Sequence, residues 1–211
     1  QEMKKLKEEA QKHGKVGFEF AYVMDHIKEE RERGVTIDLA YKKIMTQKFQ
    51  ITIIDAPGHR DFVKNMITGA SQADSAFLVI AGKSGVQPQT KEHLWLLRTA
   101  GIKNISVAIN KMDELEYSED KFNKVKEDVS KELKGVGINP ETTQFLAVSG
   151  LQGDNIVNKS DKMAWYKGPT ILEQFDKFPV PELPTNLPMR MPVQDAYENT
   201  GIGTVPVGKI V

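Results

Sequence analysis

The chain has 211 residues, and its 39% hydrophobic and 27% charged content is typical of an ordinary soluble domain with a sizeable core. Lysine plus arginine equals aspartate plus glutamate at 29 each, so the formal net charge is zero and any polyanion must be bound by a local patch. The absence of cysteine excludes a disulfide framework and thiolate metal sites, which is compatible with a cytoplasmic location. No apolar run approaches the ~18 residues of a membrane span, so we expect no membrane partner.

The N-terminal quarter of the chain predicts two helices followed by a hairpin. Apolar spacing favours helices over residues 2–12 and 21–33. A strand is expected over residues 35–46 and a second over 49–55, and their short connection favours an antiparallel pair.

From residue 61 onward, predicted helices alternate with apolar strands. The expected helices cover residues 61–69, 89–100, 118–133 and 170–178, and the expected strands cover 76–81, 105–109 and 145–148. This order predicts an α/β fold with a mostly parallel sheet, in which ligands bind at the carboxyl ends of the strands.

The C-terminal part of the chain has a different composition. Residues 179–188 contain four prolines and predict a stiff linker, and residues 189–211 alternate around a glycine turn as the start of a β-barrel domain does. We therefore expect three parts, with residues 1–178 as the first domain.

A run of Asp55, Ala56, Pro57, Gly58 and His59 closes the predicted strand 49–55. A carboxylate at a strand end can hold Mg²⁺ through a water, and a glycine N–H can approach a phosphate closely. His59 is placed to orient an attacking water or, if protonated, to stabilise developing charge, and the sequence leaves both roles open. The alternative interpretation of this run is a tight turn.

Two further polar clusters close the next strands. Asn110, Lys111 and Asp113 follow the strand 105–109, while Ser149, Gly150 and Leu151 follow the strand 145–148. One carboxylate can accept both donors of guanine, N1–H and N2–H, which assigns that role to Asp113. Asn110 can reach the base N7, the Lys111 stem can cover a ring face, and the backbone N–H groups of residues 149–151 can meet the base O6. An ordinary strand-to-helix cap explains the first cluster alone, but not the two together.

Single residues outside these clusters are less informative. Thr36 precedes the strand that pairs with the Asp55 strand, so its oxygens can reach the same Mg²⁺, although a lone threonine there is commonly structural. His13, His26 and His93 show no metal-ligand spacing, and we expect them to be surface residues without a transition-metal site.

No phosphate-binding run of the form Gly-x-x-x-x-Gly-Lys-Ser/Thr occurs anywhere in the sequence. We therefore expect the chain to be a fragment, cut at both ends, of a longer nucleotide-binding protein.

Four segments carry a family resemblance. Residues 30–38, 55–66, 110–113 and 201–209 resemble the translation elongation factor 1-alpha family of archaeal or eukaryotic type. The resemblance implies a P-loop NTPase-type G domain that lacks its first strand and P-loop here, followed by the first hairpin of a β-barrel domain. It also implies a GTPase that uses GTP/GDP and Mg²⁺ and delivers aminoacyl-tRNA to the ribosomal A site.

By the same resemblance, Thr36 is the switch I magnesium ligand, Asp55 and Gly58 belong to switch II, and His59 is the catalytic histidine. The guanine-holding residues are Asn110, Lys111, Asp113, Ser149, Gly150 and Leu151. The expected partners are aminoacyl-tRNA, the ribosome and a nucleotide exchange factor, and the expected state is a monomer.

The sequence also departs from the family pattern. The connection over residues 82–88 is short, as in bacterial elongation factor Tu, and residues 153–155 and 165–169 also resemble relatives of other function. The alternatives are therefore a GTPase of ribosome rescue or termination, the GTPase subunit of sulfate adenylyltransferase, or an inactive truncated fragment.

Overall fold

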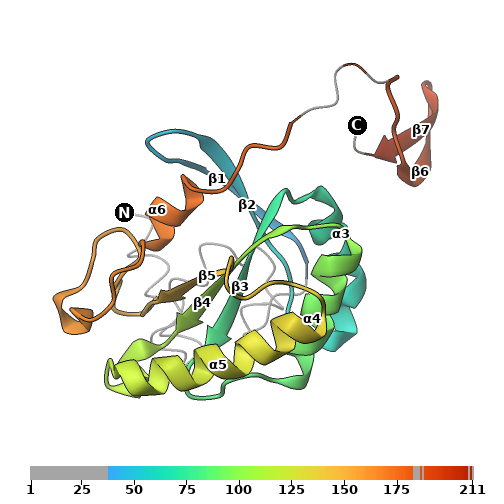
Figure 1. The fold of residues 1–211 in the computed structure, drawn as a ribbon. Helices are drawn as coiled ribbons and strands as arrows, with labels where there is room; N and C mark the ends of the chain where they lie inside the picture. The colour runs from blue at the N-terminus through green and yellow to red at the C-terminus, as the bar shows by residue number, and fades with distance from the viewer. Residues whose placement is uncertain (1–37, 183–185, 187, 209, 211) are drawn as a thin grey trace, which may run out of the picture. The chain divides into compact units, whose positions relative to one another are not determined.

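The computed structural model describes residues 38–182, 186, 188–208 and 210. Two units make up the chain, Gln1–Phe178 and Pro179–Val211, and each is described separately (Figure 1). The predicted helices 2–12 and 21–33, together with Thr36, His13 and His26, lie outside the described residues. No helix of the described part is long and apolar enough to cross a membrane.

The predicted hairpin is present and antiparallel. Strand β1 (Ala40–Met45) pairs with β2 (Gln50–Asp55), with Ala40 opposite Asp55 and Met45 opposite Gln50. The strand was expected to run from residue 35. In the described part it begins only at Ala40, and Asp38 and Leu39 lie before it. The Asp38 side chain accepts a hydrogen bond from the Leu39 N–H (2.8 Å), and such a local bond competes with strand pairing.

The centre of the first unit is a parallel sheet in the order β3–β4–β5, formed by β3 (Ser75–Ala81), β4 (Asn104–Asn110) and β5 (Gln144–Ala147). A short 3₁₀ turn, η2 (Arg60–Phe62), leads into α3 (Val63–Gln72), which precedes this sheet along the chain. Helix α4 (Pro88–Thr99) connects β3 to β4, and η3 (Met112–Leu115) with α5 (Glu119–Gly135) connects β4 to β5. The alternating strand–helix order is therefore confirmed.

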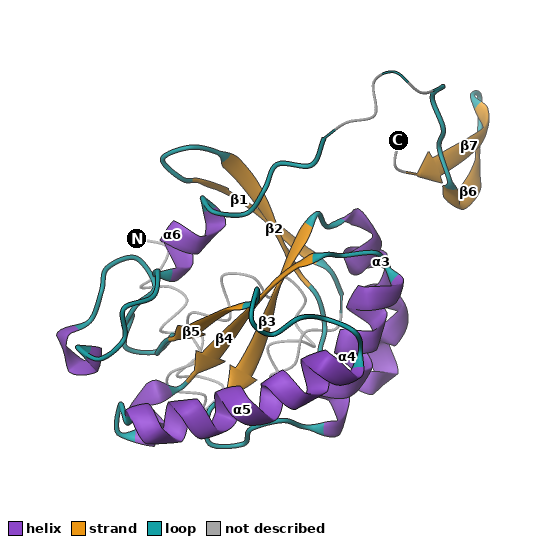
Figure 2. Cartoon of the chain, viewed as in Figure 1, coloured by secondary structure: helices purple, strands orange, loops and turns teal. Residues whose placement is uncertain are grey.

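Apolar side chains are buried on both faces of this sheet, which explains its nearly continuous apolar strands, although Val79 of β3 is exposed. Helices α4 and α5 lie on one face of the sheet (Figure 2). On that face, alternate residues of β4, including Val107 and Ile109, pack with Leu94 of α4 and Val129 of α5. The other face holds a smaller cluster made of Ala108, Leu146, Val148, Phe77, Ile156 and Ile171. Asn110 thus ends, and Ser149 comes shortly after, a strand that packs on two sides.

The last helix of the first unit is shorter than predicted. After η4 (Asp161–Met163), helix α6 covers only Ile171–Phe175, not 170–178. Thr170 caps its start by accepting a hydrogen bond from the Glu173 N–H (3.1 Å). Beyond the helix, Phe178 packs against Phe77 of β3 (ring centroids 5.3 Å apart), a tertiary contact that the local sequence does not show.

The second unit contains an antiparallel hairpin of β6 (Val193–Asn199) and β7 (Gly203–Gly208). Gly201 and Gly203 at its turn have φ of 106° and 87°, a backbone region that favours glycine. The hairpin is as expected, while its place in a β-barrel stays a prediction.

Candidate functional site

The polar residues expected around a nucleotide base follow β4 and β5. Asn110 is the last residue of β4, and Lys111 takes a left-handed conformation (φ 64°) that turns the chain into η3. The Met112 N–H donates to the Val148 carbonyl (3.1 Å), which ties η3 to the chain leaving β5. The two clusters are thus held at one end of the parallel sheet.

Asn110 joins the two clusters directly. Its Oδ1 accepts hydrogen bonds from the Lys111 N–H (2.7 Å) and from the Gly150 N–H (2.8 Å). Because this oxygen is occupied by two donors, the amide nitrogen Nδ2 remains to donate outward. A donor there suits the acceptor N7 of a purine.

Asp113 lies against Ser149. The Ser149 hydroxyl donates to Asp113 Oδ1 (2.5 Å) and accepts from the Gln152 N–H (3.3 Å). Among the described residues, no donor contacts the second carboxylate oxygen of Asp113. The carboxylate is therefore oriented by serine and retains acceptor capacity for a ligand with two adjacent N–H donors.

The remaining members of the two clusters are more exposed. Lys111 pairs with Glu114 (Nζ to Oε1, 3.2 Å), and Leu151 is 58% exposed. Gly150 lies so close to Asn110 that an added Cβ would be 3.5 Å from its side-chain amide. The structure thus brings Asn110, Asp113, Ser149 and Gly150 together, whereas their role remains a prediction.

A second layer of residues supports the Ser149 loop. Ser149 and Asp154 exchange backbone hydrogen bonds of 3.1 Å in each direction, and the Asp154 carboxylate accepts from Tyr117, Ser160 and Lys162. Burial opposes ionisation of Asp154, but these hydrogen bonds hold its pKa below the ordinary value. Sequence reasoning assigned no role to Asp154, although it stands in the Gly-Asp-Asn run after Ser149.

Asn155 fixes the same loop from beneath. It is 2% exposed and has φ of 57°, and its Nδ2 donates to the Ala147 carbonyl (2.8 Å). Its Oδ1 accepts from the Ser160 N–H (2.8 Å), so one side chain links β5 to the end of the loop. Hydrogen bonds within the chain therefore hold residues 149–155 in place.

The second predicted site follows β2. Asp55 ends that strand, Pro57 is buried and Gly58 is exposed. His59 is half exposed, and its Nδ1 accepts from the Asp61 N–H (3.3 Å). His59 contacts Asp61 and Phe62 in the turn that follows it.

His93 differs from expectation. It was predicted to be a surface residue, but it is half-buried on α4 beside Gly58, where an added Cβ would be 3.7 Å from His93 Cε1. Burial lowers the pKa of His93, against the opposing effects of Glu92 and of the Gly58 backbone. The prediction failed because sequence spacing does not show that α4 packs beside the loop after β2.

Comparisons with known proteins identify the family of the chain. The family of the elongation factor Tu GTP binding domain matches residues 1–181. The chain belongs to this family. The resemblance to elongation factor 1-alpha is also confirmed by the curated relatives.

Three of these relatives are archaeal proteins named elongation factor 1-alpha. The one from Methanocaldococcus jannaschii is 60% identical over 212 residues, covering 99% of this chain and 50% of its own length. The relative from Methanococcus vannielii is 57% identical and covers 98% of this chain and 49% of its own length. The relative from Halobacterium salinarum is 56% identical and covers 97% of this chain and 48% of its own length. The chain spans about half the length of these relatives.

A solved structure supports the fold. The crystal structure of the bacterial selenocysteine-specific elongation factor EF-Sec matches with a TM-score of 0.64 and 28% identity, covering 89% of this chain and 30% of that one. The G-domain fold class predicted from the sequence is therefore confirmed.

Proposed function

We propose that this chain is the guanine-reading part of a translational GTPase that delivers aminoacyl-tRNA to the ribosomal A site. The observation that supports this most strongly is the Asp113 carboxylate, oriented by Ser149 beside the Asn110 amide. The names of the archaeal relatives favour elongation over ribosome rescue, termination or sulfate activation.

Base selection follows from donor and acceptor chemistry. Guanine presents N1–H and N2–H donors to the Asp113 carboxylate, whereas adenine presents an acceptor at N1. An adenine base would leave buried acceptors facing each other, which costs about 1–3 kcal/mol for each unsatisfied group. The Asn110 amide and the Leu151 backbone N–H complete this base site, since the Gly150 N–H already donates to Asn110 Oδ1. The Lys111 stem covers the ring.

The phosphate end of the site is assigned by the family resemblance. We assign Thr36 and Asp55 to Mg²⁺, Asp55 through a water, and Gly58 to the terminal phosphate. The bound Mg²⁺ supplies charge neutralisation on the phosphates. His59, next to Gly58, orients the attacking water or, if protonated, stabilises the charge that develops on the phosphate.

The remaining assignments concern the whole protein. We infer a cytoplasmic monomer whose partners are aminoacyl-tRNA, the ribosome and a nucleotide exchange factor.

The proposal is tested in a chimaera in which this chain replaces the aligned half of the Methanocaldococcus jannaschii relative. His59→Ala should leave GTP affinity within about twofold and slow ribosome-stimulated hydrolysis about a hundredfold to a thousandfold, as loss of a transition-state-stabilising group does. Single-turnover hydrolysis with and without archaeal ribosomes measures this.

Thr68→Ala is the matched control, because Thr68 is exposed on α3 and donates only to the Lys64 carbonyl (3.1 Å). It should hydrolyse GTP at the rate of the unsubstituted chimaera. Near-normal hydrolysis by His59→Ala would show that His59 has a packing role only. A chimaera that the ribosome does not stimulate at all would contradict the translational function.

A further inference from the structure

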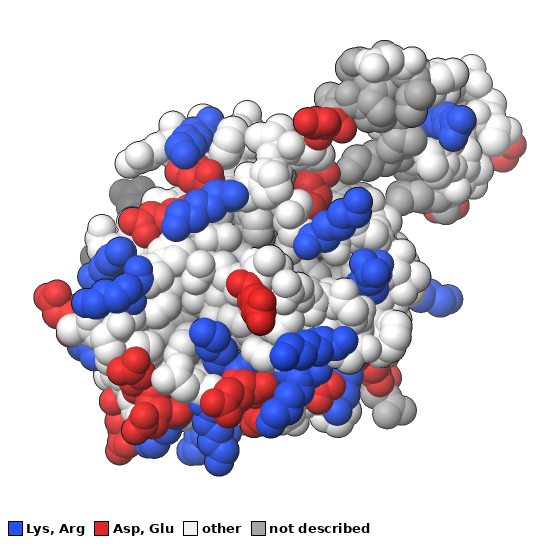
Figure 3. Space-filling model, in the orientation of Figure 1, with Lys and Arg blue, Asp and Glu red and all other residues white. Residues whose placement is uncertain are grey.

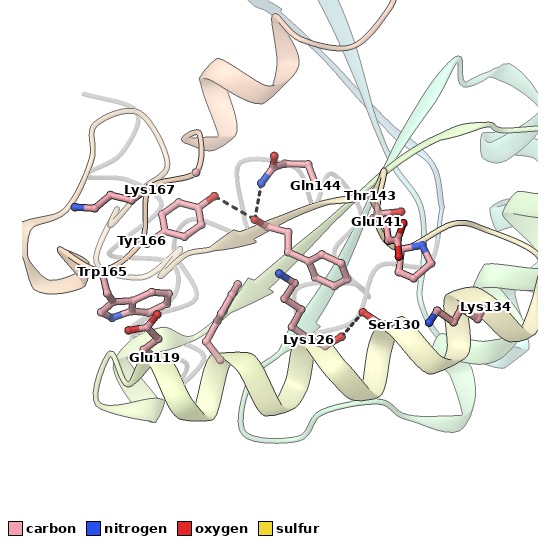
Figure 4. A pocket seen from close by; sticks show the side chains of 14 residues that line it. Glu119, Lys126, Ser130, Lys134, Glu141, Thr143, Gln144, Trp165, Tyr166 and Lys167 are labelled. Atoms are coloured by element: carbon pink, nitrogen blue, oxygen red, sulfur yellow. Dashed lines mark hydrogen bonds between the residues drawn. The ribbon is translucent and has the colours of Figure 1, made fainter.

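A groove of about 590 Å³ runs along helix α5 on the outer side of β5 (Figure 4). Its walls are α5, the segment from Pro140 into β5, and the loop 165–168. This segment leads into the start of β5, whereas the base-reading residues Ser149 and Gly150 come after the end of that strand. The groove is therefore separate from the proposed nucleotide site.

One end of the groove is aromatic. The Trp165 ring packs against Phe122 (centroids 5.3 Å apart) and Tyr166 (6.0 Å), and the Trp165 Nε1–H donates to the Tyr117 carbonyl (2.8 Å). Phe122 is only 4% exposed, but Trp165 and Tyr166 are half-buried. An apolar side chain can therefore pack against these two anchored rings.

Two lysines of α5 line the groove away from the aromatic end: Lys126 lies in the middle, with its Nζ 5.4 Å from the centroid of the Phe145 ring, and Lys134 lies at the end opposite Trp165 (Figure 4). Lys126 and Lys134 are exposed, and no carboxylate of the described residues lies within ion-pair distance of either. By contrast, Lys121 and Lys131 of the same helix pair with carboxylates at 2.6 and 3.0 Å. Eight residues of α-helix separate Lys126 from Lys134 by about 12 Å, which is about four residues of extended peptide.

The adjacent edge of β5 does not offer a free carbonyl at Phe145. The Phe145 oxygen accepts from Gln144 Nε2 (2.8 Å) and from the Tyr166 hydroxyl (3.2 Å). An occupant is therefore held by side chains and not by addition of a strand.

We propose that this groove binds a short acidic peptide segment, with one apolar side chain against Trp165 and Tyr166 and carboxylates at Lys126 and Lys134. The charge complementarity of two ammonium groups without ion partners supports this occupant. The inference is independent of the nucleotide-binding proposal.

RNA fits the groove less well. Phe122 and Phe145 are 4% and 5% exposed, so they present no open face on which a base can stack. Glu119 and Glu141 also line the groove and oppose any anion placed beside them, a peptide carboxylate as well as a phosphate, so they do not distinguish the two occupants. On the face drawn in Figure 3, acidic and basic side chains are interspersed.

The test uses the whole chain with Trp95→Phe, which leaves Trp165 as the single tryptophan of the two in the sequence. The probe is a fluorescein-labelled peptide with one leucine followed by two glutamates four residues apart. Its anisotropy and the Trp165 emission are titrated at low and high salt. A peptide with glutamine in place of glutamate, and a twelve-nucleotide polyuridine, are measured beside it.

Lys126→Gln with Lys134→Gln should weaken peptide binding at least about tenfold, from two surface charge contacts of about 0.7 kcal/mol each. The matched control is Lys103→Gln with Lys124→Gln, which removes the same charge from exposed positions outside the groove. Saturable, salt-sensitive binding that only the groove variant loses, with a Trp165 emission change, supports the proposal. The proposal is overturned if the peptide does not bind, if both double variants lose binding equally, or if the Trp165 emission does not change. It is also overturned if the glutamine peptide binds equally well or the RNA binds more tightly.

Discussion

At the scale of single residues, Asp154 shows how the base-reading loop is held in place. Its carboxylate accepts hydrogen bonds from Ser160 (2.8 Å), Tyr117 (3.0 Å) and Lys162 (3.2 Å). These donors favour the ionised form. Because the pKa of Asp154 is lowered in the folded chain, its contribution to stability is present above the unfolded pKa near 3.8 and is lost as the pH falls through the lower folded value.

Asp154→Asn should lower the free energy of unfolding by about 1–3 kcal/mol at neutral pH, because an amide cannot serve all three donors. The control is Asp128→Asn, whose carboxylate pairs only with exposed Lys131 and should cost less than about 0.5 kcal/mol. Urea unfolding at pH 7 and at pH 3 measures both variants. A difference between wild type and Asp154→Asn that does not shrink at pH 3 would contradict this role.

His93 gives a second prediction at this scale. Since burial lowers its pKa, the unfolded chain binds the proton more readily, and stability is lost as the pH falls below 6.5 through the folded pKa. The Hε1 resonance of His93, assigned by comparison with His93→Gln, should titrate below pH 6.5. A midpoint above that value would mean that His93 is not buried beside Gly58.

At the scale of elements, packing between β3 and η3 depends on a glycine. A Cβ on Gly82 would be 3.1 Å from Leu115 Cγ and 3.3 Å from the Asn110 carbonyl oxygen. Gly82→Ala should therefore destabilise the chain by about 1–3 kcal/mol through overpacking. Thermal unfolding followed by circular dichroism measures the change.

Gly135→Ala is the matched control, because no atom lies within 4 Å of its added Cβ at the end of α5. It should stabilise the chain by up to about 1 kcal/mol through helix propensity. If both alanines have the same effect, the close approach at Gly82 is absent.

The same scale shows how much of the fold could be predicted from the sequence. The parallel strands and α4 and α5 were predictable because buried strands read as apolar runs and these helices carry local start signals, such as Pro88 and Ser118. The extent of α6 and the burial of His93 were not, because tertiary contacts decide both. At the candidate site, the spacing of Asp113 and Ser149 predicted their approach, but the support from Asp154 and Asn155 depends on a loop conformation that spacing does not show.

At the scale of the whole molecule, the described strands form separate sheets. β2 pairs with β1, and β3 pairs with β4, but no described strand joins β2 to β3. Val79 of β3 is 60% exposed, which is unusual for a valine in a parallel strand. The family resemblance predicts a further strand between β2 and β3, which would join the two sheets.

The chain alone should bind GTP far more weakly than the chimaera described above, because no Gly-x-x-x-x-Gly-Lys-Ser/Thr run is present to cradle the phosphates. Calorimetric titration of both proteins with GTP and Mg²⁺ measures the difference. Micromolar binding by the chain alone would show that other residues hold the phosphates.

The guanine-reading site is tested most directly by competition binding. GDP, ADP and XDP compete for the chimaera with and without the Asp113→Asn substitution. The unsubstituted protein should prefer GDP, and Asp113→Asn should weaken GDP about a hundredfold through two lost charge-assisted bonds while favouring XDP, whose 2-oxo group accepts from the new amide. Asp128→Asn should leave the preference unchanged. Unchanged GDP preference in Asp113→Asn would contradict the site described here.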